Sequence, residues 1–86
     1  MLHNLVFHHV DKSQNFQDFI ERKFQKIQRK FKDLMNVKMN IEKVGQDFMF
    51  KMILERYGQP VVLHSVDHNP YKAASKVFSK ASALRN

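Results

Sequence analysis

The residues best placed to do chemistry in this chain are cationic, and they fall in two short segments. These segments hold ten of the 15 lysine and arginine residues of an 86-residue chain whose formal net charge is +7. Ammonium and guanidinium groups lined up in this way bind the phosphates of a polyanion. The first segment contains Arg22, Lys23, Lys26, Arg29, Lys30 and Lys32, and the second contains Lys72, Lys76, Lys80 and Arg85.

Acidic residues balance the first basic segment in part and the second not at all. Asp33 is one of three acidic residues near the first segment, whereas no Asp or Glu follows Asp67. Lysines repeated every fourth residue of a helix repel one another weakly, and Lys72, Lys76 and Lys80 have this spacing. These charges could simply form a solvated face that binds nothing. The pattern instead favours binding to a polyanion, with a nucleic acid as the first candidate and an anionic membrane surface as the second.

The five histidines form no ligand pattern. His8 and His9 are neighbours on a predicted strand, where successive side chains point to opposite faces, and this geometry is poor for chelation. Asp67 and His68 could form a general-base pair, but no nucleophile or pocket pattern accompanies them. We therefore expect no enzymatic activity, no cofactor and no metal site.

Composition indicates one small globular domain over residues 1–86. Apolar residues make up 43% of the chain and include 8 Phe, which is enough for a hydrophobic core. The chain has no cysteine, which excludes disulfides and fits a reducing compartment. No segment has the pattern of a signal peptide or the length of a membrane span, and we expect a cytoplasmic protein.

Hydrophobic periodicity places the first basic segment on a helix. Residues 5–10 read as a strand, and Ser13 is a suitable N-cap for a helix that follows. The apolar residues then recur at helical spacing, and they are Phe16, Ile20, Phe24, Ile27 and Phe31. At about 100° per residue, Arg22, Lys26 and Arg29 fall nearly opposite this stripe.

Three more strands follow, each marked by alternating apolar and polar residues. They cover residues 37–42, 48–54 and 61–66, with turns at Gly45 and Gly58. Short connections pair these strands as an antiparallel meander. The solvent face of the sheet would carry Val6, Met49, Ile53, Val62 and Val66. Such a face is often only half apolar, or it forms a homodimer or partner interface.

The last helix begins at Asn69-Pro70, because Asn caps a helix and Pro suits its first position. Lys72, Lys76 and Lys80 then lie along its solvent side. Each helix has one apolar stripe, and together they cover one face of the sheet. We predict an α+β fold with the order β-α-β-β-β-α, in which a four-stranded sheet carries two helices on one face.

Aromatic side chains lie mostly on inward stripes, so they indicate a core rather than a platform on which bases stack. Phe19 and Tyr71 fall off the tightest part of these stripes. We expect Tyr71 to pack over the start of the last helix, with contact to RNA as the alternative.

With these elements in place, the whole chain resembles the short ribosome hibernation promoting factors, also called ribosome-associated inhibitors or sigma-54 modulation proteins. The resemblance is strongest over residues 19–31, F-I-E-R-K-F-Q-K-I-Q-R-K-F, and residues 67–74, D-H-N-P-Y-K-A-A. It implies the same element order and one ribosome-binding domain over residues 1–86. Ser75 stands where the family commonly has an Asp.

The resemblance also implies a function. The family inhibits translation during ribosome hibernation, a stress response, by binding the small ribosomal subunit in the channel used by mRNA and tRNA. Its basic surface, which lies against ribosomal RNA, corresponds by position to Lys23, Lys26, Lys30, Lys76 and Lys80. Together with the solvent faces predicted above, the expected RNA-binding residues are Arg22, Lys23, Lys26, Arg29, Lys30, Lys72, Lys76 and Lys80.

Two alternatives stay open at this point. A free-standing double-stranded RNA-binding module also has three antiparallel strands under two helices, with lysines at the start of the last helix. Such modules lack a strand equivalent to residues 5–10, so the presence of that strand discriminates against them. A protein-interaction module would instead use the open sheet face, and its charge would serve only solubility.

Overall fold

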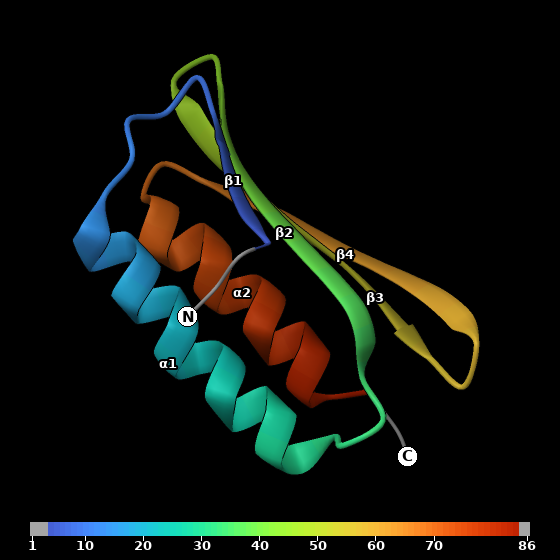
Figure 1. Cartoon of the computed structure of the whole chain (residues 1–86). Coiled ribbons are helices and arrows are strands. Elements are labelled where there is room, and N and C mark those ends of the chain that lie inside the picture. The colour runs from blue at the N-terminus through green and yellow to red at the C-terminus, as the bar shows by residue number, and fades with distance from the viewer. Residues whose placement is uncertain (1–3, 85–86) are drawn as a thin grey trace.

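The computed structural model describes residues 4–84, which form a four-stranded sheet with two helices on one face (Figure 1). In chain order the elements are β1 (Leu5–His8), α1 (Gln14–Lys30), β2 (Met35–Val44), β3 (Asp47–Arg56), β4 (Gln59–Asp67) and α2 (Pro70–Ser82). The strands lie in the order β1-β2-β3-β4, with β1 parallel to β2 and the other neighbours antiparallel. The predicted α+β fold, element order and meander are confirmed.

β1 is shorter than the sequence predicts. The strand ends at His8 rather than at Val10, because His9 takes a φ of +58° and turns the chain out of the extended region. Leu5 and Phe7 still point toward the helices and pack on the core. This additional parallel strand is the feature that double-stranded RNA-binding modules lack.

α1 begins where its predicted N-cap places it. The Ser13 hydroxyl accepts a hydrogen bond from the Phe16 N–H at 3.1 Å, as an N-cap does. At the other end the Phe31 N–H donates to the Ile27 carbonyl at 2.8 Å. The predicted stripe faces the core, with Phe24 half-buried at its margin. The buried residues within the helix are Phe16, Ile20 and Ile27.

Two tight turns join the three meander strands. Val44 pairs with Asp47 across the first turn, and Gly45 has a φ of +63° there. A residue without Cβ adopts such a left-handed φ at no steric cost, and two-residue hairpin loops require it. The second turn is Tyr57-Gly58, and both of its residues have positive φ.

α2 is held close to the sheet by its cap and its small residues. The Asn69 side chain accepts from the Tyr71 N–H at 2.8 Å, and Pro70 occupies the first turn. The helix packs against β3, β4 and α1, so it lies deeper in the molecule than α1 does. Ala73, which the predicted stripe omits, is fully buried. The buried residues of α2 are Ala73, Ala74, Val77, Phe78 and Ala81.

The core fills the space between the helices and one face of the sheet. Phe50, Met52 and Leu54 of β3 are fully buried at its centre, as alternation along the strand predicts. The opposite face of the sheet is open. Val62 and Val66 are about half exposed there, which confirms the predicted outer face.

Candidate nucleic-acid interface

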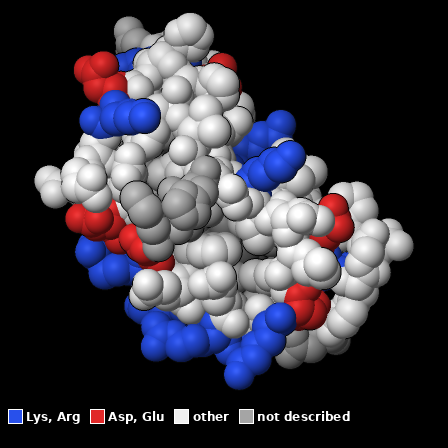
Figure 2. All heavy atoms as spheres, in the orientation of Figure 1, with Lys and Arg blue, Asp and Glu red and all other residues white. Residues whose placement is uncertain are grey.

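Three cations of α1 extend toward solvent rather than into the core. Arg22, Lys26 and Arg29 are exposed, and within the described residues no hydrogen bond or ion pair engages their head groups. Figure 2 shows Lys and Arg gathered along the edge of the molecule where α1 runs in Figure 1. We call these three residues the outward cations. Their charges are available to an external anion.

The two other predicted site residues of α1 contact the protein itself. The Lys23 ammonium lies 5.5 Å from the centroid of the Phe19 ring, within the range of a cation–π contact. The Lys30 ammonium lies 5.4 Å from the Phe31 centroid and donates to the Ser82 carbonyl at 2.5 Å. Lys30 therefore joins the ends of the two helices, where a cation also complements the carbonyl end of α2.

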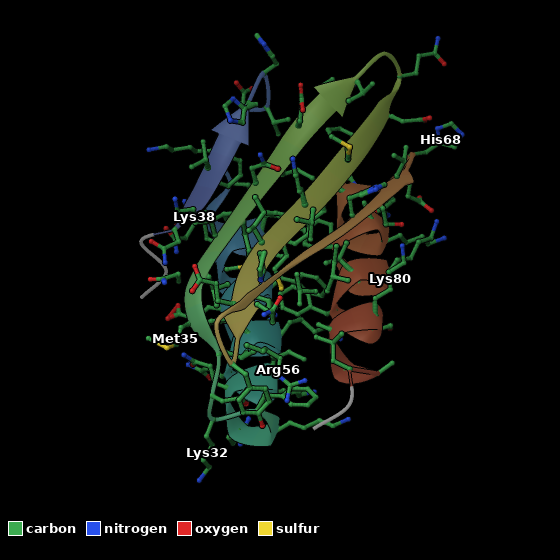
Figure 3. All side chains as sticks on the ribbon, turned by 90° about the vertical axis from the view of Figure 1, so that its right-hand side faces the viewer. Lys32, Met35, Lys38, Arg56, His68 and Lys80 are labelled. Atoms are coloured by element: carbon green, nitrogen blue, oxygen red, sulfur yellow. The ribbon has the colours of Figure 1, made fainter. Side chains whose placement is uncertain are left out.

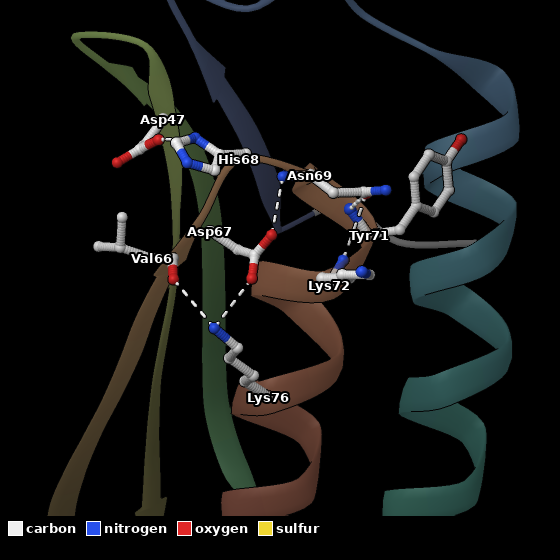
Figure 4. Close-up of polar contacts among 8 residues, drawn as sticks. All are labelled: Asp47, Val66, Asp67, His68, Asn69, Tyr71, Lys72 and Lys76. Carbon is white, nitrogen blue, oxygen red and sulfur yellow. Dashed lines mark hydrogen bonds and ion pairs between the residues drawn. The ribbon is translucent and has the colours of Figure 1, made fainter.

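Two lysines of α2 turn back onto β4 instead of extending into solvent. The Lys76 ammonium donates to the Val66 carbonyl at 3.2 Å and pairs with the Asp67 carboxylate at 2.9 Å (Figure 4). The Lys80 ammonium donates to the His64 carbonyl at 2.8 Å, from the side of α2 beside β4 (Figure 3). We call Lys76 and Lys80 the edge lysines, because β4 is an edge strand of the sheet.

The prediction that the second basic segment has no counter-charge is therefore wrong. Asp67, at the end of β4, supplies one to Lys76 through the fold rather than along the helix. Lys72 is exposed, and its ammonium makes no such contact within the described residues. Arg85 lies outside the described residues.

The same carboxylate organises the start of α2. One Asp67 oxygen accepts from the Asn69 backbone N–H at 2.9 Å, and Asn69 in turn caps the helix (Figure 4). This backbone hydrogen bond, followed by the contact with Lys76, holds the pKa of Asp67 below its ordinary value. Asp67 is thus ionised at neutral pH and fixes one edge lysine.

A shallow groove runs between the two helices on the side away from the sheet. Lys23 and Lys26 line it from α1, and three serines line it from α2. Its volume is about 310 Å³. Ammonium and hydroxyl groups on facing walls suit phosphate oxygens, which accept hydrogen bonds from both. Ser75 contributes a hydroxyl to this wall, and none of the residues that line the groove is acidic.

A buried arginine that the sequence analysis did not single out supports the end of α1. Arg56 is only 7% exposed, and its Nε donates to the Asp33 carboxylate at 3.0 Å. Its guanidinium also lies 4.6 Å from the Phe31 centroid. Asp33 therefore serves this pair and does not neutralise the basic segment as predicted. The alternation along β3 indicates that Arg56 is buried, because Arg56 occupies the next inward position after Leu54.

The aromatic side chains near the start of α2 belong to the core. The Tyr71 ring packs edge-on against Phe16 and Phe19, with centroids 5.2 and 5.1 Å apart. This confirms the packing expected for Tyr71 and leaves little of its ring for RNA.

The histidines within residues 4–84 do not gather into a cluster of ligands. His9 lies beyond β1, and His68, in the β4–α2 connection, pairs with Asp47 at the start of β3 (Figure 4). No group of three or more metal-ligating side chains occurs within residues 4–84. Over the same residues, no helix has the length and apolar character needed to cross a membrane.

Comparison with known proteins gives a match over nearly the whole chain. The model of the family described as sigma 54 modulation protein / S30EA ribosomal protein matches residues 3–83. Comparison with curated protein sequences gives no match.

Two solved structures are similar to this chain. The N-terminal domain of Thermus thermophilus Protein Y superposes with a TM-score of 0.79 at 18% identity, covering 92% of this chain and 88% of that one. A ribosomal subunit interface protein from Coxiella burnetii superposes with a TM-score of 0.82 at 16% identity, covering 90% of this chain and 85% of that one. At these identities the likeness is one of fold.

Proposed function

The chain belongs to the sigma 54 modulation protein / S30EA ribosomal protein family, and we propose that it inhibits translation during ribosome hibernation by binding the small ribosomal subunit. In this role it occupies the channel for mRNA and tRNA by shape and charge, without catalysis. A site of action on ribosomes places it in the cytoplasm. The name of the similar Coxiella burnetii protein, a ribosomal subunit interface protein, supports the same role.

The observation that carries the proposal is the set of outward cations. Arg22, Lys26 and Arg29 share one side of α1 and are engaged by no other described residue. In a chain with a net charge of +7, they form a track for phosphates. Release of the counterions condensed on RNA then supplies much of the binding free energy, and binding weakens as salt rises.

The other five predicted RNA-binding residues have different roles in this proposal. Lys72 extends the track at the start of α2, and Lys23 contributes a wall of the groove between the helices. Lys30, Lys76 and Lys80 keep the helices and β4 in place and contact RNA only with the part of their charge that faces solvent.

The test compares two pairs of charge reversals. Lys26→Glu with Arg29→Glu changes the outward cations, and the variant should keep its fold while co-sedimentation with small subunits falls by at least about a hundredfold. The matched control is Lys38→Glu with Lys51→Glu, which makes the same charge change on the outer face of the sheet. If only net charge mattered, the two variants would lose binding equally.

Retained co-sedimentation of the α1 variant would refute the proposed surface. Binding of the native protein to a generic RNA duplex, with none to ribosomes, would instead favour the double-stranded RNA-binding module. The homodimer through the outer sheet face stays a prediction, and sedimentation equilibrium of the free protein tests it.

A further inference from the structure

The turn between β3 and β4 contains a residue that the fold does not favour. Arg56 pairs with Gln59, so Tyr57 and Gly58 form a two-residue loop, and their φ values are +53° and +76°. Two-residue loops with positive φ at both positions prefer Asn-Gly or Asp-Gly. Gly58 fits this preference. Tyr57 does not, because a bulky side chain at positive φ is strained.

Packing does not explain Tyr57 either. Its side chain is 73% exposed, whereas every other Phe and Tyr of the chain is buried or half-buried. A tyrosine with a strained backbone and an exposed side chain adds little to the stability of the fold. Such residues persist where an external partner uses them.

The ring of Tyr57 is nevertheless held from one side. The Arg56 guanidinium lies 5.4 Å from the Tyr57 centroid and 4.6 Å from the Phe31 centroid, so it stands near both rings. Arg56 is itself buried and hydrogen-bonded to Asp33. The ring is thus positioned before any partner arrives, which lowers the entropy lost on binding.

Further cations gather around Phe31, the other ring that Arg56 contacts. Lys30 contacts Phe31, and Arg29 and Lys32 line a depression beside the same phenyl ring. Figure 3 shows Arg56 and Lys32 at the same end of the molecule. The chain next to the ring is polar and exposed, with Gln59 directly after the turn. An exposed ring beside cations matches the stacking sites of proteins that bind unpaired nucleotides.

We propose that Tyr57 stacks on an unpaired nucleobase of the RNA that the outward cations hold by its phosphates. This inference rests on the proposed function and adds to it a contact with a base, at the tip of the β3–β4 hairpin. The base extends the row formed by Phe31, Arg56 and Tyr57. Stacking of this kind accepts any base, because every base has a π-face.

The experiment uses three variants, two of which change Tyr57. Tyr57→Asn restores the preferred turn and removes the ring, and Tyr57→Phe keeps the ring. Lys26→Gln with Arg29→Gln removes phosphate contacts and serves as the reference. Affinity is measured over a salt series for isolated small subunits and for protein-free small-subunit RNA.

We expect Tyr57→Asn to bind both targets about tenfold more weakly while its melting temperature rises by about 4 °C. The dependence of its affinity on salt should match that of the native protein, because no phosphate contact is lost. Tyr57→Phe should bind within about twofold of the native protein, because its ring still stacks. The reference variant should instead have a shallower salt dependence.

Native affinity of Tyr57→Asn for both targets would overturn the inference and leave the proposed function intact. Weakened binding to intact subunits alone would assign Tyr57 to a ribosomal protein and would also overturn it. A loss by Tyr57→Phe equal to that of Tyr57→Asn would show that the hydroxyl, not the ring, makes the contact. Unchanged binding of the reference variant would refute the proposed function separately.

Discussion

On α1 the outward cations extend into solvent, whereas on α2 the edge lysines turn back to β4. The difference follows from where each helix lies. α2 packs against β3, β4 and α1, so a lysine on its flank finds carbonyl groups and a carboxylate within reach. The outer side of α1 has no neighbouring element (Figure 1).

The two helices use the same kind of charge in two ways. Cations without an internal partner can exchange their counterions for RNA phosphates. Cations that already hold carbonyl groups must give up those contacts before they can bind tightly elsewhere, and the net gain is smaller. Charge density alone therefore overstates how many lysines of α2 are available to an external anion.

The largest expected effect is a difference in salt dependence between the two helices. Lys26→Gln with Arg29→Gln should weaken binding to small subunits about thirtyfold and reduce the salt slope by about two, one for each lost phosphate contact. Lys76→Gln with Lys80→Gln should weaken binding less than about threefold. Co-sedimentation over a salt series measures both. Equal changes in the salt slope for the two variants would contradict the conclusion that the cations of α1 and the edge lysines of α2 have different roles.

A second prediction concerns the Arg56–Asp33 pair, which supports the end of α1 and involves none of the outward cations. Asp33→Asn removes the charge that Arg56 faces in a largely buried pair, and it should lower the free energy of unfolding by about 2 kcal/mol. The control is Asp18→Asn on the exposed side of α1, for which we expect less than about 0.5 kcal/mol. Urea denaturation checks both. Similar values for the two variants would mean that the pair contributes nothing specific.

The edge lysines should contribute to the free energy of unfolding, whereas the outward cations should not. Lys76→Ala with Lys80→Ala should lower the free energy of unfolding by about 1 kcal/mol and the melting temperature by about 5 °C. Lys26→Ala with Arg29→Ala should leave both unchanged within error. The uncovered carbonyls of β4 should also favour association of strands between molecules, which light scattering detects. A native melting temperature for the α2 variant would contradict this role.

The smallest expected effect is a pH dependence at α2. Because the folded protein lowers the pKa of Asp67, this carboxylate stabilises the native state above its unfolded pKa of about 3.9. The contribution is lost as pH falls through the folded pKa. Native protein should therefore unfold at a higher temperature than Asp67→Asn at pH 7, and the difference should vanish in acid. A difference that persists in acid would exclude the ionised carboxylate as its cause.

Local patterns predicted most of the fold. The stripe from Phe16 to Phe31, the alternation through Phe50 and the Asn69-Pro70 start each depend on residues close in sequence, and the structure has each element where they indicate. The boundaries are less accurate: β1 ends two residues before the predicted end, and β2 extends two residues beyond the prediction at each end. Nothing in the local sequence indicates that His9 leaves the extended region, as its φ of +58° does.

The candidate site was less accessible to sequence analysis. Lys72, Lys76 and Lys80 have the same spacing and the same residue type, so nothing in their segment separates one from the others. The partners of Lys76 and Lys80 are on β4, and backbone carbonyls have no sequence signal at all. Tyr57 precedes Gly58 at a predicted turn, but its positive φ and its exposure appear only in the folded chain.

The sequence by itself determined the elements of this protein, their amphipathic faces and a basic surface, because hydrophobic period, caps and charge are properties of neighbouring residues. Tertiary structure decided which cations stay available to an external anion, which ones bond to β4, and that Arg56 contacts an exposed Tyr57. These outcomes depend on distances between side chains and strands that are far apart in the sequence. Only the packing of α1 and α2 on the sheet sets those distances.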